Sequence, residues 1–202
     1  VPRSTEGRPL TVYISGRAGV AQKGTKAAAE VIGMLRKLNV SVRLVVRGVE
    51  PGTEEVQRRI LSAAAGGDVE VRPFTTERSE LHADLDEADV VVMTSRAEGF
   101  GLTAHEAAAS GVPTVVPTSS GFGRWLGEPG RFPEHLTLPS LVEQGFVEQV
   151  PKELWFEALK YVVEKYPDAQ ERALRLQQQF LDQEITWEAA VRSLIDEARR
   201  LR

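Results

Sequence analysis

The chain has 202 residues, and its 25 Lys and Arg against 29 Asp and Glu give a formal charge of −4, which disfavours the usually basic nucleic-acid-binding domains. Its 42% hydrophobic and 27% charged residues are those of an ordinary globular protein, which excludes an intrinsically disordered chain. The absence of cysteine excludes disulfides, thiol catalysis and Cys-ligated metal sites.

The part of the chain before about residue 117 alternates short β-branched runs with amphipathic stretches. The runs predict strands, and the stretches between them predict helices. The expected strands cover residues 10–15, 41–46, 69–74, 90–94 and 114–117, and the expected helices cover 25–38, 53–65, 77–88 and 102–110. Strict alternation with apolar central strands favours a doubly wound, Rossmann-like α/β fold, in which a parallel sheet carries helices on both faces.

Two details of this first part bear on its surface. The aliphatic run from Val90 to Met93 is far shorter than the ~18 to 20 apolar residues of a membrane-spanning helix. We therefore expect a soluble, cytoplasmic protein with no transmembrane segment. Four acidic residues crowd the end of the third expected helix and predict a solvated face; they are Asp84, Asp86, Glu87 and Asp89.

The second part of the chain has a different texture. Residues 121–145 combine Gly, Pro and isolated aromatic residues, which predicts an irregular loop. Helical periodicity resumes at 153–165, 168–181 and 186–201, with apolar stripes that predict packing against a core. We expect a single domain over residues 1–202, with 153–202 as a C-terminal helical extension.

The loop after the first strand, GRAGVAQKGTK at 16–26, lies where open parallel sheets bind ligands, beyond the carboxyl ends of the strands. It lacks the second Gly of the dinucleotide fingerprint, and the order of its Lys and Thr is the reverse of that in a P-loop. Arg17 and Lys23, flanked by glycines, place two cations beside a helix N-terminus, which suits a diphosphate. A solvated loop is the alternative.

The loop after the fourth strand, RAEGFGLTAHE at 96–106, carries the most specific pattern. Two glycines bracket Phe100 directly before a helix, which leaves the N–H groups of residues 99–102 to face an anion or a hydroxyl. The carboxylates of Glu98 and Glu106 suit adjacent sugar hydroxyls, from which they accept hydrogen bonds. Helix capping by Glu98 and a solvated position for Glu106 are the alternatives.

Together these motifs resemble the C-terminal, donor-binding domain of retaining glycosyltransferases of the GT-B fold, especially family 4. The family's E-G-F-G-x-x-x-x-E pattern is reproduced at 98–106, and its following A-x-G-x-P stretch at 109–113. Its Gly-Arg and Lys-Gly pairs are similar to Gly16-Arg17 and Lys23-Gly24. The resemblance covers roughly residues 9–118, is weaker at Thr186-Trp187, and implies one half of a GT-B fold.

The resemblance also implies roles for individual residues. It suggests that Gly16, Arg17 and Lys23 bind the diphosphate of a nucleotide sugar, that Glu98, Phe100 and Gly101 meet its sugar, and that Glu106 binds the ribose. Gly99 and Leu102 are also expected to bind the substrate, and Arg72 and Phe74 to lie beside the base. Strand-end packing is the alternative for Phe74. Glu98, Arg17 and Lys23 would be catalytic, because the two cations oppose the charge that grows on the leaving diphosphate.

The implied reaction moves a hexose from a nucleoside diphosphate sugar, UDP or GDP linked, to an unknown acceptor. No cofactor or metal is implied, and the three histidines, His82, His105 and His135, are too scattered to suggest a metal site.

Two departures from the family keep another function open. The chain begins with Val and lacks the family's N-terminal acceptor domain, so we expect it to be part of a longer protein. Residues 119–125 lack the Glu of the family's Gly-Gly-x-x-E loop, which leaves the sugar side of the pocket in doubt. The alternative is therefore a non-catalytic nucleotide or nucleotide-sugar sensor module of a multidomain protein.

Overall fold

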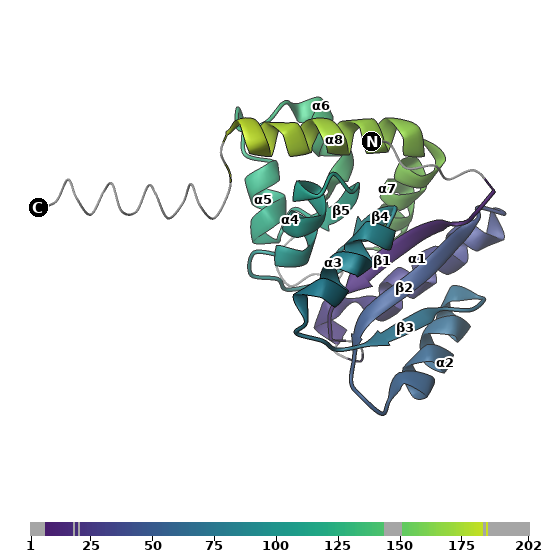
Figure 1. Ribbon diagram of the computed structural model, residues 1–202. Helices are drawn as coiled ribbons and strands as arrows, with labels where there is room; N and C mark the ends of the chain where they lie inside the picture. Colours follow the sequence, from purple (N-terminus) through teal and green to yellow (C-terminus); the bar gives the residue numbers. More distant parts are fainter. Residues whose placement is uncertain (1–6, 18, 20, 144–150, 184, 186–202) are drawn as a thin grey trace, which may run out of the picture.

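The computed structural model describes residues 7–17, 19, 21–143, 151–183 and 185 of the chain (Figure 1). An all-parallel sheet of six strands runs through this part. The strand order is β3-β2-β1-β4-β5-β6. The strands are β1 (Leu10–Ser15), β2 (Val42–Val49), β3 (Glu70–Pro73), β4 (Val90–Val92), β5 (Thr114–Pro117) and β6 (Leu141–Val142). This is the Rossmann order, in which successive strands are added on one side of β1 up to β3 and then on its other side from β4 to β6. It confirms the predicted fold.

Helices cover both faces of the sheet. Neighbouring side chains of a strand point to opposite faces, so the continuous apolar runs of these strands make both faces apolar. In β1, Val12 and Ile14 join one core cluster, whereas Tyr13 joins the cluster on the opposite face. The first cluster lies under α1 (Thr25–Lys37), α2 (Glu54–Ala65) and α7 (Lys152–Glu164), and the second lies under α3 (Arg78–Glu87) and α4 (Leu102–Ala109).

The segment expected to be an irregular loop, 121–145, contains regular structure, so that prediction is wrong. It forms α5 (Gly121–Leu126), α6 (Glu134–Thr137), the 3-10 turn η2 (Leu138–Ser140) and strand β6. The Ser120 hydroxyl caps α5 by accepting a hydrogen bond from the Gly123 N–H at 2.9 Å. Phe122 and Leu126, one helical turn apart, are buried. Burial of this face and pairing of β6 with β5 override the Gly-rich composition.

The C-terminal helices expected at 153–165 and 168–181 are confirmed as α7 and α8 (Tyr166–Asp182). The helix expected at 186–201, with the Thr186-Trp187 pair, lies outside the described residues. Among the helices that are described, none combines the length and apolar character needed to cross a membrane.

The solvated acidic face expected at the end of α3 is only partly present. Asp86 and Glu87 are exposed, but Asp84 and Asp89 are buried, so the prediction is wrong for these two. Asp89 accepts hydrogen bonds from the backbone N–H of Thr11 at 2.8 Å and from Arg8 Nη2 at 2.7 Å. Burial of these carboxylates is compensated by cationic and N–H partners that lie far away in the sequence.

Candidate functional site

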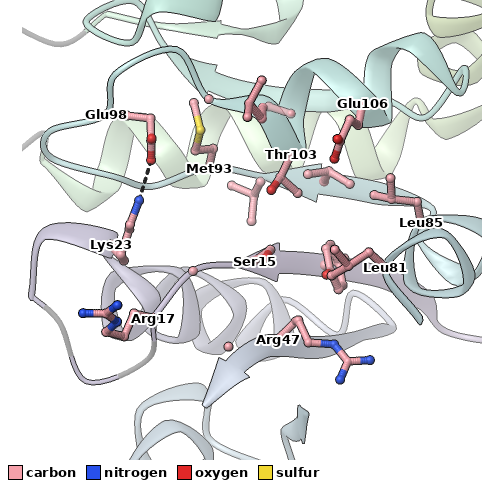
Figure 2. A pocket seen from close by; sticks show the side chains of 18 of the residues that line it. Ser15, Arg17, Lys23, Arg47, Leu81, Leu85, Met93, Glu98, Thr103 and Glu106 are labelled. Carbon is pink, nitrogen blue, oxygen red and sulfur yellow. Dashed lines mark hydrogen bonds and ion pairs between the residues drawn. The ribbon is translucent and has the colours of Figure 1, made fainter. Parts of the chain in front are cut away.

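A cavity of about 730 Å³ opens near the carboxyl ends of the strands, beside the loops that follow β1, β3 and β4 and the end of β2. Its size falls within the usual range for small-molecule sites, ~300 to 1,000 Å³. Figure 2 shows Arg17 and Lys23 on one wall and Glu98 and Glu106 on the opposite wall. The structure therefore brings the two predicted loops together around one space.

Most of the predicted site residues line this cavity. They are Gly16, Arg17, Lys23, Phe74, Glu98, Phe100, Gly101, Leu102 and Glu106. Arg72 and Gly99 are not among the lining residues. Arg72 pairs instead with the carboxylates of Glu70 at 2.6 Å and Glu87 at 2.5 Å, and with Asp84.

The wall formed by the β1–α1 loop depends on glycines at close backbone contacts. Gly24, which precedes α1, has a φ of +67°, and a Cβ atom there would lie 2.1 Å from the Thr94 carbonyl oxygen. Gly48, at the end of β2, has a φ of +103°, and a Cβ there would lie 2.4 Å from the Gly16 oxygen. Both positions combine a left-handed backbone with contacts that leave no room for a side chain.

An ion pair joins the two walls (Figure 2). Lys23 Nζ lies 2.8 Å from Glu98 Oε2, and the Ser95 hydroxyl donates to the same oxygen at 3.3 Å. The backbone reinforces this contact, because the Arg96 N–H donates to the Gln22 oxygen at 2.7 Å. The residues expected to bind the diphosphate and the sugar thus contact each other directly.

The opposite wall is the first part of α4. Gly101 precedes this helix with a φ of +99° and, as a glycine, has no side chain with which to cap the helix N-terminus. The first N–H groups of an α-helix have no acceptor within the helix, so those of α4 remain as donors beside the cavity. Thr103 and Glu106, three residues apart, both line the cavity (Figure 2). The helical spacing from Glu106 is a sequence signal that would have found Thr103.

Phe74 and Thr75, which follow β3, line the cavity beyond the end of that strand. The Phe74 side chain is 63% exposed, so strand-end packing does not account for it. Sequence reasoning identified Phe74 but missed Thr75, which carries no periodic or motif signal of its own.

A buried polar network, which sequence reasoning missed, lies beneath the cavity. Arg47, a lining residue from β2, donates from Nε and Nη2 to the two oxygens of Asp84 at 2.6 and 2.8 Å. The Tyr13 hydroxyl donates to Asp84 Oδ2 at 3.0 Å, and Arg47 Nη1 donates to the Pro73 oxygen at 3.0 Å. Burial by itself would raise the pKa of Asp84, but the hydrogen bonds from Arg47 and Arg72 outweigh it and lower that pKa.

Residues 119–125, which lack the family's Glu, do not line the cavity but support its wall from behind. The Gly121 N–H donates to the Gly99 oxygen at 2.7 Å, and the Phe122 N–H donates to the Phe100 oxygen at 2.6 Å. These two hydrogen bonds attach the start of α5 to the loop between β4 and α4.

Aromatic side chains fill the space behind that loop. Phe100 and His105 contact each other and also contact Phe122 and Trp125, with ring centroids 5.5–6.5 Å apart. His105 also stacks on Phe180 of α8 at 5.8 Å. Burial lowers the pKa of His105, an effect that Glu106 partly opposes. His105 therefore serves as a packing residue of α4.

Comparison with known proteins gives one matching family and several curated relatives. A family described as "Family 4 Glycosyltransferase in conflict systems" matches residues 1–194. The D-inositol 3-phosphate glycosyltransferase of Pseudarthrobacter chlorophenolicus is 34% identical over 105 residues, which are 50% of this chain and 25% of that protein. The homologue from Paenarthrobacter aurescens is 33% identical over 109 residues, 52% of this chain and 27% of that protein. The chain spans about a quarter of the length of these curated relatives.

Solved structures share the fold at lower sequence identity. The sucrose-phosphate synthase of Thermosynechococcus elongatus superimposes with a TM-score of 0.73 at 20% identity, covering 96% of this chain and 46% of that one. The C-terminal domain of the group 1 glycosyltransferase LpcC from Francisella tularensis superimposes with a TM-score of 0.64 at 20% identity, covering 87% of both chains.

Proposed function

The chain belongs to the family 4 glycosyltransferases in conflict systems, a group of the GT-B type, and from this premise we propose that its cavity binds a nucleoside diphosphate sugar. In this proposal the domain supplies the donor side of a hexosyltransferase that retains the anomeric configuration. The acceptor side would come from a second Rossmann-like domain.

The observation that carries the proposal is the pairing of cations and carboxylates across one cavity. Arg17 and Lys23 offer positive charge to a diphosphate, and the N–H groups at the start of α4, which lack an acceptor within the helix, add donors. Glu98 and Glu106 offer acceptors to hydroxyls at two separate places on the opposite wall. A ligand with two phosphates between two sugars matches this arrangement.

The chemistry would be electrostatic. As the bond between the sugar and the diphosphate breaks, negative charge grows on the leaving phosphate, and Arg17 and Lys23 would stabilise it. Glu98 would hold hydroxyls of the transferred sugar, and Glu106 would hold the ribose. The base, uracil or guanine, would dock beside Phe74 and Thr75, so that Phe74 gains cover for its exposed ring.

One observation favours a second candidate function, a sensor that binds the nucleotide sugar without transferring it. Residues 119–125 contain no acidic residue and do not line the cavity, so this segment adds no second carboxylate beside Glu98 on the sugar side of the site. A sensor needs only the binding wall, which the described residues supply.

Calorimetric titration of the 202-residue chain with UDP, GDP, ADP and their glucose esters tests the proposal. We expect at least one nucleotide to bind, and a double variant carrying Arg17→Ala and Lys23→Ala to lose ~3 kcal/mol, about 150-fold in affinity. A matched control replaces two exposed arginines of α2, Arg58 and Arg59, with Ala and should bind like wild type. Failure of the wild-type chain to bind any of them, or equal affinity of the double variant, would overturn the proposal.

A further inference from the structure

The ion pair between Lys23 and Glu98 spans the place that the proposed function gives to the bond between diphosphate and sugar. The two groups lie 2.8 Å apart, with side chains 33% and 21% exposed. Among the described residues, Glu98 is the sole hydrogen-bond acceptor of Lys23 Nζ. Glu98 Oε2 accepts from both Lys23 and Ser95, whereas Oε1 has no hydrogen bond within the described part of the chain.

This contact places one negative charge beside Lys23, one of the two cations of the site. A phosphate oxygen that approaches Lys23 Nζ also approaches the Glu98 carboxylate and is repelled by it. A phosphate that takes Lys23 from Glu98 also leaves that carboxylate, which is mostly shielded from water, without its partner. A ligand that takes Lys23 away from Glu98 must therefore supply Glu98 with other hydrogen-bond donors.

The two ligands of a transfer cycle differ in how they can do so. An intact nucleotide sugar carries hydroxyl groups just beyond its second phosphate, and these can donate to Glu98 in place of Lys23. The bare nucleoside diphosphate has no such hydroxyls. Its terminal phosphate also gains a second ionisation with a pKa of about 6, so that it brings additional negative charge to the same place.

Resting on the proposed function, we infer that Glu98, through its ion pair with Lys23, makes the site discriminate between the intact nucleotide sugar and the bare nucleoside diphosphate. Glu98 is thus a specificity residue that disfavours the product of transfer. The ion pair re-forms when the product leaves, which favours release.

The test compares two dissociation constants by calorimetry, for whichever of UDP, GDP and ADP binds and for its glucose ester. In wild type the glucose ester should bind more tightly. In Glu98→Gln, which keeps the shape but removes the charge, the bare diphosphate should bind several-fold more tightly and the glucose ester more weakly. The preference for the sugar-linked form should therefore fall about tenfold or more.

Two further variants separate this inference from a structural effect. In Glu164→Gln, which removes the charge from an ion pair of similar length with Lys160 on α7, 2.9 Å, the preference should stay at the wild-type value. In a Lys23→Ala background, the added Glu98→Gln substitution should no longer strengthen binding of the bare diphosphate, since the gain passes through Lys23. Thermal melting confirms that each variant folds.

Each alternative outcome has a definite meaning. If wild type binds both ligands and Glu98→Gln leaves the preference unchanged, or weakens both ligands equally, the inference is overturned while the proposed function stands. If wild type binds neither ligand, the proposed function fails and this inference fails with it.

Discussion

Glu106 faces the cavity from α4, and Thr103 lies three residues before it on the same face (Figure 2). Glu106 is exposed there, as a solvated helix residue would be, and its two carboxylate oxygens can accept from both hydroxyls of a ribose bound in the cavity.

Replacement of Glu106 by Gln should therefore weaken binding of a ribonucleoside diphosphate by ~1 to 3 kcal/mol. The 2′-deoxy form should lose less, because it has one hydroxyl fewer to donate. Calorimetry with both forms measures the difference, and Glu164→Gln is the control. Equal losses for the two nucleotides would mean that Glu106 does not bind the ribose.

Asp84 contributes to the stability of the fold rather than to ligand binding. Its pKa is lowered in the folded protein, so the stability it contributes is fully present above its unfolded pKa, near 3.8. That contribution is lost as the pH falls through the lower pKa of the folded state. Removal of the charge leaves Arg47, which is 7% exposed, without its bidentate partner.

We expect Asp84→Asn to lower the free energy of unfolding by ~3 to 5 kcal/mol at pH 7 and to weaken the dependence of stability on acid below pH 4. The control is Asp86→Asn, an exposed acid on the same helix, which should change little. Urea denaturation between pH 7 and pH 3 makes the comparison. A loss for Asp84→Asn no larger than that for Asp86→Asn would contradict this account.

At the scale of elements, the β1–α1 loop lies in direct contact with Thr94, which follows β4. The Thr94 hydroxyl donates to the Gly24 oxygen at 2.9 Å, and the missing side chain at Gly24 permits the approach of Thr94. This contact fixes where Lys23 stands relative to Glu98.

Substitution of Gly24 by Ala should therefore reduce stability by more than the strain of the left-handed backbone alone would. Gly66, at the end of α2, provides the matched control, because its φ of +61° is similar but nothing lies within 4 Å of a Cβ there. We expect Gly66→Ala to lose ~1 to 2 kcal/mol of stability and Gly24→Ala to lose more and also to bind nucleotide more weakly. Equal stability losses, measured by denaturation, would show that the contact with Thr94 is unimportant.

The elements that were predicted correctly are those with a local signal. The β-branched runs of β1 and β2 and the stripe of α7 specify their own conformation, and the order of strands and helices then favours a parallel sheet. The two residues of β6 are too few for periodicity, and this strand exists because it pairs with β5. Asp84 was assigned to the surface because no local pattern reveals that Arg47, from another strand, would meet it.

The candidate site could likewise be predicted only where the sequence carries a local signal. The glycines and charges of each loop could be identified from motifs, and the order of the strands predicts that these loops converge. The direct contact between Lys23 and Glu98 could not, because it depends on side-chain conformations across two loops 75 residues apart.

At the scale of the whole molecule, the cavity is built from one sheet edge. The lining residues come from β1, β2 and β4 and from the loops and helices that follow β1, β3 and β4. A transfer reaction also requires an acceptor held against the sugar, and such orientation contributes as much as ~7 to 11 kcal/mol to lowering a barrier.

We therefore expect the 202-residue chain by itself to bind donor but to show no transfer, and at most trace hydrolysis. Water has access to the site and weakens the electrostatic effect of Arg17 and Lys23. Incubation with labelled nucleotide sugars and a broad acceptor mixture measures the activity. Efficient transfer that Glu98→Ala abolishes would show that these 202 residues complete the active site.

The hydrogen bonds from Gly121 to Gly99 and from Phe122 to Phe100 have a consequence for how related proteins diverge. Changes in α5 would move the loop behind the Glu98 wall without altering any residue that lines the cavity. Under the proposed function, substitutions at residues 119–125 would therefore alter sugar preference from positions that do not line the cavity, while Lys23, Glu98 and Glu106 stay the same. Two proteins with identical motifs would in this way prefer different donors.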